Sequence, residues 1–239
     1  MNPDLRIGTA GWSIASRYAG QFPPGGSHLE RYARRMNAVE INSSFYKPHQ
    51  RKTYERWAAP TPAKFRFAAK LPKAISHDNA LVGCGDFLDR FVAEVTGLGD
   101  RLGVLLLQLP PQLAYDAETF DAFLDELRQR IATPLALEPR HASWFAADVD
   151  DRLRQRQVAR VAADPARVPG AGEPGGWEGL AYFRWHGTPR IYYSDYGDAE
   201  LAALRVRLLQ SVQRNVPTWC ILDNTAAGAA LGNALALQG

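Results

Sequence analysis

The sequence predicts an α/β protein built as a single (β/α)8 TIM barrel, one domain over residues 1–239. Short apolar segments alternate with helical patterns along the whole chain, which is typical of βαβ units around a parallel sheet. The chain has 239 residues, close to the roughly 250 residues that a (β/α)8 barrel typically needs. Eight apolar segments can be assigned as strands, the number that closes such a barrel.

The first half of the chain contains four strand and helix pairs. The first strand ends near Gly8 and Gly11, whose backbone freedom permits a tight exit, and Ser27 is the expected N-cap of the first helix. The segment 103–109 is apolar without interruption and therefore suits a strand covered on both faces. The expected strands are 5–9, 38–41, 65–69 and 103–109, and the expected helices are 28–36, 50–58, 86–98 and 117–130.

The second half continues the alternation with one interruption. The segment 165–179 is rich in Gly and Pro, so an irregular connection is expected there in place of a regular sixth helix. Asp198 is the expected cap of the next helix, which runs to about residue 214. The expected strands are 135–137, 158–163, 180–184 and 218–222, and the expected helices are 148–157, 198–214 and 226–237.

An open doubly wound sheet is the alternative fold. It usually carries a G-x-G-x-x-G phosphate-binding sequence after its first strand, and residues 8–12, which read GTAGW, do not have this spacing.

The composition is that of an ordinary globular protein, with 46% hydrophobic and 22% charged residues. A net charge of +3 is compatible with an anionic ligand and too small to indicate nucleic acid without a localised patch. Because no signal peptide or membrane span is visible, we expect a cytoplasmic protein. Cys220 is expected to be a core residue.

Polar side chains follow nearly every predicted strand. In a (β/α)8 barrel the carboxyl ends of the strands meet at one face, where ligands bind. Residues two apart on a strand point to the same side, so Glu138 and Arg140 can face one site. The candidates for catalysis are Glu40, Glu138 and His186, and the candidates for ligand binding are Asn42, Lys70, Gln108, Arg140, His141, Arg184, Asp223 and Asn224.

The cations Lys70, Arg140 and Arg184 follow different strands and are expected to converge. They can bind a phosphate or carboxylate, for which Arg offers a bidentate fork. Alternatively, they neutralise carboxylates such as Glu40 and Glu138 in a buried network. The predicted partner is a small polar or anionic molecule. Acid–base chemistry by the two glutamates and His186 is compatible with these residue types, and whether the protein is an enzyme stays open.

A divalent metal would be the alternative occupant of this site. The residues His141, His186, Glu138, Asp164 and Asp223 are suitable ligand types. The chain lacks an H-x-x-x-H or H-E-x-x-H element, so we predict no metal and no cofactor.

The segment 185–197 combines Arg190 with Trp185 and three tyrosines, Tyr192, Tyr193 and Tyr196. Basic and aromatic groups together can stack on bases and hold phosphates, so nucleic acid is a possible partner. A loop packed over the rim by its own aromatic side chains is the favoured interpretation, because one such loop is not a basic stripe.

Several segments form a recognisable set of motifs: IGTAGWS at 7–13, NAVEINSSFYKPH at 37–49, FRFAAKLPKAISH at 65–77, LEPRHASWF at 137–145 and YFRWHGTPRIYYSDY at 182–196. In these segments the chain resembles the YecE-like family, domain of unknown function 72. The resemblance implies a (β/α)8 barrel and no agreed reaction. Similar barrels include metal-dependent sugar isomerases and an abasic-site endonuclease, so a metal-dependent phosphodiesterase or endonuclease and a non-catalytic scaffold are the alternative functions.

Overall fold

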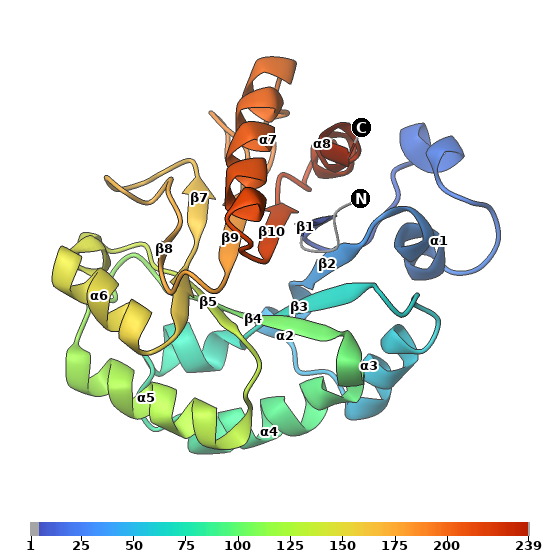
Figure 1. The fold of residues 1–239 in the computed structure, drawn as a ribbon. Coiled ribbons are helices and arrows are strands. Elements are labelled where there is room, and N and C mark those ends of the chain that lie inside the picture. The colour runs from blue at the N-terminus through green and yellow to red at the C-terminus, as the bar shows by residue number, and fades with distance from the viewer. Residues whose placement is uncertain (1–4, 239) are drawn as a thin grey trace.

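The computed structural model describes residues 5–238 and contains two β-sheets with helices outside the strands (Figure 1). One sheet has the strand order β1–β10–β9–β7, and the other has the order β2–β3–β4–β5–β6–β8. The strands are β1 (Leu5–Thr9), β2 (Ala38–Ile41), β3 (Arg66–Lys70), β4 (Leu102–Gln108), β5 (Leu135–Glu138), β6 (Val158–Arg160), β7 (Ala162–Asp164), β8 (Gly175–Gly176), β9 (Ala181–Trp185) and β10 (Thr218–Leu222).

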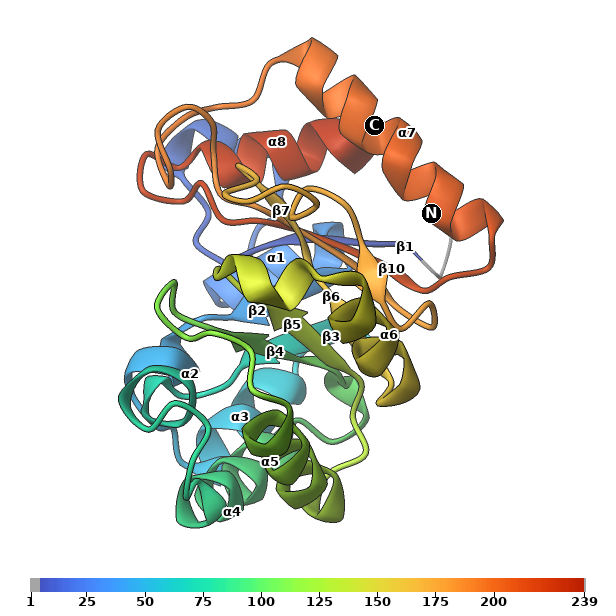
Figure 2. The same ribbon diagram turned by 90° about the vertical axis from the view of Figure 1, so that its left-hand side faces the viewer.

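The helices surround the two sheets, with α7 and α8 on the first sheet and α3 to α6 around the second (Figures 1 and 2). No helix among residues 5–238 combines the length and the apolar character needed to cross a membrane. The α-helices are α1 (His28–Arg35), α2 (Ser43–Tyr46), α3 (Arg51–Ala58), α4 (Gly85–Val95), α5 (Ala117–Arg130), α6 (Ala147–Gln155), α7 (Asp198–Gln213) and α8 (Ala229–Gln238).

The sheets are parallel except where the two-residue strand β8 pairs antiparallel with β6. The predicted α/β class with parallel sheets is therefore confirmed. The prediction of one unbroken strand at 158–163 was wrong, because β6 pairs with β5 and β7 pairs with β9 on either side of Val161. At the opposite junction, a single parallel bridge joins Ala10 beyond β1 to Glu40 in β2.

Two apolar clusters lie on opposite sides of the strands. The larger cluster packs strand residues such as Val39, Leu105 and Phe183 against the helices. The second cluster takes residues from both sheets, and small side chains are prominent in it: Ala38, Ala68, Val104, Leu106, Ala136, Ala159, Val161, Leu180, Tyr182, Trp219 and Ile221. Strands buried on both faces explain the continuous apolar segments of the sequence.

Local interactions define several helix ends. In α1 the predicted cap is confirmed, since Ser27 Oγ accepts from the Glu30 backbone N–H and the Glu30 carboxylate accepts from the Ser27 N–H. The prediction that Asp198 caps α7 was wrong: Gly197 is the cap residue, and its N–H donates to Glu200 Oε2 at 2.7 Å. The Glu200 carboxylate reaches back over one turn to the Gly197 N–H, so the cap lies one residue earlier than predicted.

The segment 165–179 contains no α-helix, as predicted. Arg160 organises it from within β6, donating to Asp150 Oδ1 at 3.0 Å and to the Gly170 carbonyl at 3.0 Å. A side chain at Gly175 would place its Cβ 2.1 Å from the Arg160 guanidinium. An alanine there would force the Arg160 guanidinium or the Asp150 carboxylate to shift, so glycine suits the point where this loop crosses the arginine.

Other segments depart from the expectations in detail. Helix α4 ends at Val95 and a 3-10 helix, Thr96–Arg101, completes the segment that we expected as a continuous helix. The short helix α2, a π-helical turn at Ala74–Asp78 and a 3-10 turn at Ala142–Phe145 were not predicted. Cys84 and Cys220 are both buried and unpaired, and Cys220 lies in the larger core cluster as expected.

Candidate functional site

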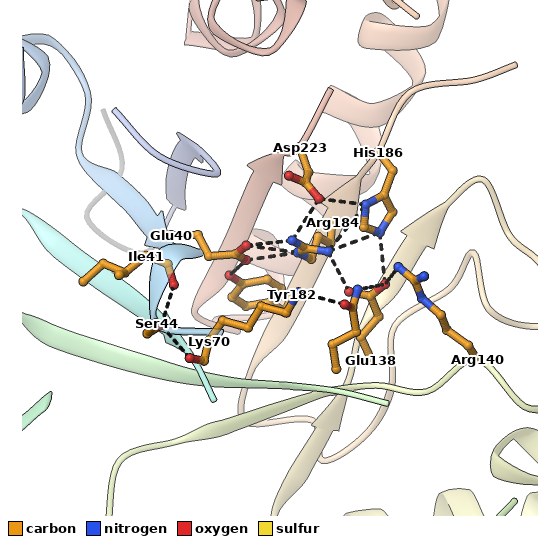
Figure 3. A network of polar contacts seen from close by, with 11 residues as sticks. Glu40, Ile41, Ser44, Lys70, Glu138, Arg140, Tyr182, Arg184, His186 and Asp223 are labelled. Carbon is orange, nitrogen blue, oxygen red and sulfur yellow. Dashed lines mark hydrogen bonds and ion pairs between the residues drawn. The ribbon is translucent and has the colours of Figure 1, made fainter. Parts of the chain in front are cut away.

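The side chain of Arg184 lies at the centre of a buried polar network at the carboxyl ends of the strands (Figure 3). Its Nε and Nη2 donate to Glu40, the shortest distance being 2.8 Å to Oε1. Its Nη1 donates to Glu138 Oε2 at 3.0 Å, and its Nη2 lies 2.9 Å from Asp223 Oδ2. One guanidinium thus connects carboxylates from β2, from β5 and from the residue after β10.

The positions of these side chains follow from the alternation of the strands. Glu40, Lys70 and Glu138 each lie two residues beyond an alanine of the second apolar cluster, namely Ala38, Ala68 and Ala136. Residues two apart on a strand share a face. The polar network therefore continues the second cluster toward the carboxyl ends of the same strands.

Glu138 is hydrogen-bonded at both carboxylate oxygens. Oε1 accepts from Gln108 Nε2 at 3.0 Å, from His186 Nε2 at 3.0 Å and from Arg140 Nη2 at 3.2 Å, while Oε2 accepts from Arg184. Burial alone would raise the pKa of the Glu138 carboxyl, but the cations His186 and Arg184 hold that pKa well below its usual range. Glu138 is consequently an ionised anchor within this network.

His186 lies between two carboxylates. Its Nδ1 is 3.0 Å from Asp223 Oδ2, and its Nε2 is 3.0 Å from Glu138 Oε1. Burial by itself lowers the pKa of His186, but the Glu138 carboxylate outweighs this and the pKa is raised. The imidazolium form fits this geometry, because it alone can donate from both ring nitrogens.

Lys70 has a different environment from Arg184. Its Nζ donates to Gln108 Oε1 at 2.8 Å and lies 3.9 Å from the centre of the Phe45 ring. No carboxylate of residues 5–238 lies within the 4.0 Å of an ion pair with Lys70. Burial and the Arg184 cation lower the pKa of Lys70 to about 8 against the opposing effect of more distant carboxylates.

Arg140 is the most exposed cation of the site, with 19% of its side chain exposed. It donates to Glu138 and interacts with Tyr192. Beside it, Glu138, His186 and Ile191 line a cavity of about 20 Å³, together with residues of the segment 165–171. Burial lowers the pKa of His77, and the nearby cations Lys70 and Arg140 lower it further.

Three predicted ligand-binding residues lie outside the network around Arg184. The His141 ring accepts from the Ser143 N–H at 3.2 Å and caps a 3-10 turn. Asn224 Nδ2 donates to Asn233 Oδ1 at 2.8 Å and so connects its loop to α8. Asn42 precedes α2, and its buried Oδ1 has no hydrogen-bond partner among residues 5–238. A ligand-binding role for these three stays a prediction.

Tyr182 belongs to the site and was absent from the prediction. Its hydroxyl donates to Glu40 Oε2 at 2.9 Å, and the ring is fully buried. Tyr182, Arg184 and His186 alternate along one strand and its end, so the period-2 pattern contained the signal. We overlooked it because a tyrosine within an apolar strand has the pattern of a core residue.

The carboxylates do not form an obvious cation site. Among residues 5–238, no group of three or more His, Cys, Asp or Glu side chains is arranged to hold a metal ion. Glu40 and Glu138 point their oxygens at Arg184, and Asp223 contacts both Arg184 and His186. A metal would have to displace a buried guanidinium, so these residues do not fit one in this arrangement.

The loop at 185–197 is packed at both of its ends and exposed in its middle. The rings of Trp185 and Tyr196 are 4.5 Å apart, and the Tyr196 hydroxyl donates to Asp164 Oδ1 at 2.6 Å. Tyr192 and Tyr193 are 40% and 46% exposed. The interpretation as a packed loop therefore holds for the first pair of aromatic residues and not for the second.

The free energy of unfolding is expected to depend on pH through His186. A raised pKa contributes stability below the unfolded value of about 6.5, and this contribution is lost as pH rises through the folded value. We expect His186→Gln to remove a decline of at most about 1.4 kcal/mol per pH unit above pH 6.5. The contribution of Lys70 to the free energy of unfolding has the opposite sign. Because the pKa of Lys70 is lowered to about 8, this contribution increases as pH rises from about 8 upward.

Urea unfolding of both proteins between pH 6 and 8 measures this difference. Because the His28 side chain is exposed, His28→Gln serves as the matched control substitution. Parallel profiles for the wild type and His186→Gln would contradict an imidazolium at this position.

A family model described as "Protein of unknown function DUF72" matches residues 6–239. The UPF0759 protein YecE of Escherichia coli K12 is 34% identical over 149 residues, which cover 60% of this chain and 54% of that protein. The UPF0759 protein YunF of Bacillus subtilis is 27% identical over 152 residues, 59% of this chain and 52% of that protein. The chain thus spans about half the length of these curated relatives in the matched regions.

Two solved structures share the fold. A DUF72 family protein of Enterococcus faecalis superposes with a TM-score of 0.83 at 22% identity, covering 98% of this chain and 94% of that one. A DUF72 family protein of Thermotoga maritima superposes with a TM-score of 0.80 at 24% identity, covering 98% and 97%. At this level of identity the likeness establishes the fold alone.

Proposed function

The chain belongs to the DUF72 family of proteins of unknown function, and from that premise we propose that it binds a small anionic molecule at the carboxyl ends of its strands. The binding groups would be Lys70 and Arg140. Arg184 would act as a buried anchor that holds Glu40 and Glu138 in place.

We infer further that the two sheets form a single closed (β/α)8 barrel. Four features support this. At the two junctions, β6 and β7 are separated only by Val161, and Ala10 bridges to Glu40. Arg184 in β9 of one sheet contacts Glu40 in β2 of the other. The second apolar cluster also takes residues from both sheets, as the interior of a barrel would.

The unequal pairing of the cations carries the proposal of an anionic ligand. Arg184 contacts three carboxylates, whereas Lys70 donates to one neutral amide oxygen and Arg140 shares the carboxylate of Glu138 with three other donors. Lys70 therefore retains N–H groups without carboxylate partners among residues 5–238. Buried cations are stabilised by an anion, and a phosphate or carboxylate would supply it.

The size of the cavity limits the ligand. About 20 Å³ beside Arg140 is enough for roughly one ordered water. A phosphate or a small carboxylate is larger than one water, so its binding beside Arg140 would require movement of the segments around Pro165 and Ile191, which line the cavity.

Replacement of Arg140 by methionine is expected to weaken stabilisation by anions at least tenfold. The change removes the exposed donors but keeps most of the side-chain volume, and Glu138 retains its other donors. We expect phosphate, sulfate or acetate to raise the midpoint of thermal unfolding of the wild type. For the same rise, Arg140→Met should need at least a tenfold higher anion concentration, because it loses a charged hydrogen bond that contributes about 1.5–3 kcal/mol.

Arg154→Met is the matched control, because Arg154 forms only exposed ion pairs with Asp150 and Asp151. It should respond to each anion as the wild type does. Equal responses of Arg140→Met and Arg154→Met would reject the proposed site.

The other candidate functions have less support. A nucleic-acid partner draws on the contact of Arg190 with the Tyr193 ring, at 3.9 Å, in an exposed part of the loop. It predicts retention of DNA or RNA that weakens steeply with salt. A metal-dependent phosphodiesterase would need ligands that Arg184 now engages, and a non-catalytic scaffold predicts that no small molecule stabilises the protein. Acid–base roles for Glu40, Glu138 and His186 stay predictions.

A further inference from the structure

We propose that Lys70 is a nucleophile that forms an imine with the carbonyl group of a small oxo acid. This inference rests on the proposed function, because the carboxylate of the oxo acid would occupy the anion site beside Arg140. The substrate class is thereby narrowed from any small anion to one that carries an aldehyde or ketone next to its anionic group.

The first argument is the pairing of the Lys70 amine. Its Nζ has one hydrogen-bond partner among residues 5–238, the amide oxygen of Gln108 at 2.8 Å, and its side chain is buried. An ammonium ion in such a position lacks the carboxylate that buried charges normally require. The ammonium form therefore attracts an anion, and the minor neutral form, which one amide acceptor satisfies, keeps its lone pair for reaction.

The second argument is that the amide of Gln108 is held in one orientation. Gln108 Nε2 donates to Glu138 Oε1 at 3.0 Å, so its Oε1 is the atom directed at Lys70. The backbone of Lys70 is also held, because the Ser44 hydroxyl donates to the Lys70 carbonyl oxygen at 2.6 Å at the end of β3. Gln108 is accordingly a positioning residue for the amine.

The third argument is the charge around the amine. Burial and Arg184 lower the pKa of Lys70 to about 8, although Glu40, Glu138 and Asp223 oppose this change. On the side of the 74–78 turn, His77 faces the cations Lys70, Arg140 and Lys73 together with Asp78. With a pKa of about 8, about one-tenth of the amine is neutral at pH 7, and a desolvated lysine next to another cation is an activated nucleophile.

The covalent step balances without a cofactor. The lone pair of Nζ attacks the carbonyl carbon, the C–N bond forms and one amine proton passes to the carbonyl oxygen, giving a carbinolamine. The C–O bond then breaks, and the oxygen leaves as water with the second amine proton. The product is the imine and one water, and no group is oxidised or reduced.

The test is reductive trapping of the full-length protein with glyoxylate and sodium cyanoborohydride, followed by intact-mass measurement and peptide mapping. We expect Lys70 to be modified at least tenfold faster than the half-exposed Lys73. The rate at Lys70 should rise as pH rises through about 8 and should fall when phosphate competes. Lys70→Arg should lose the rapid modification, whereas Lys73→Arg should retain it.

Modification of Lys70 no faster than of Lys73, or an unchanged rate in Lys70→Arg, would overturn the proposal. The outcomes also separate the two proposals. Phosphate that stabilises the wild type without any trapping at Lys70 would leave the anion site standing and reject the nucleophile. Equal trapping at Lys70 of acetaldehyde and glyoxylate, unaffected by Arg140→Met, would support the nucleophile and reject the anionic substrate class.

Discussion

Arg184→Met is expected to lower the free energy of unfolding by about 3–5 kcal/mol, the range for breaking a buried ion pair by removing one partner. Three carboxylates would lose their common cation: Glu40, Glu138 and Asp223, all almost fully buried. Methionine fills much of the same volume, so the loss would be mainly electrostatic. Equilibrium unfolding in urea, monitored by tryptophan fluorescence, measures it.

The control for this variant is an arginine whose pairs are exposed. Arg154→Met removes ion pairs in which 46% of the Arg154 side chain is exposed, and such pairs contribute about 0–1 kcal/mol. Arg184→Lys should recover little of the loss, because an ammonium cannot span three carboxylates as a planar guanidinium does. A loss below about 1 kcal/mol for Arg184→Met would show that the network is not a structural anchor.

Gly8→Ala is expected to destabilise the protein by about 1–3 kcal/mol or more, as overpacking at a rigid site does. A Cβ at Gly8 would lie 2.2 Å from the carbonyl oxygen of Ala38, a backbone atom that cannot rotate away. Gly8 lies in β1 and Ala38 in β2, where the two sheets meet. This variant therefore tests whether the proposed barrel depends on close contact at that junction.

Gly20→Ala is the matched control, because among residues 5–238 a Cβ built at Gly20 meets nothing within 4 Å beyond its local backbone. Its free energy of unfolding should stay within about 0.5 kcal/mol of the wild type, as for surface substitutions in general. Both variants can be compared in the same urea titration. Equal stability of Gly8→Ala and Gly20→Ala would mean that β1 and β2 separate at little cost, and would count against a closed barrel.

The positions of the central polar residues were predictable from the sequence. Lys70 and Glu138 end their strands and Glu40 lies one residue before the end of β2, and strand periodicity places all three on one face with alanines two residues earlier. The parallel α/β class follows from the same alternation. The ends of individual elements were less predictable: Glu200 moves the start of α7, and a local change in pairing at Val161 divides one expected strand.

The sequence by itself determined which residue types meet at the carboxyl ends of the strands, because strand alternation is a local property of the backbone. Only the tertiary structure decided how they pair. Lys70 and Arg184 were equivalent candidates for binding an anion, yet Arg184 contacts three carboxylates and Lys70 contacts an amide. The physical reason is that pairing depends on which side chains from distant strands lie within about 3–4 Å of each other. At such distances charge interactions in a buried site are strong. The local sequence does not specify these distances.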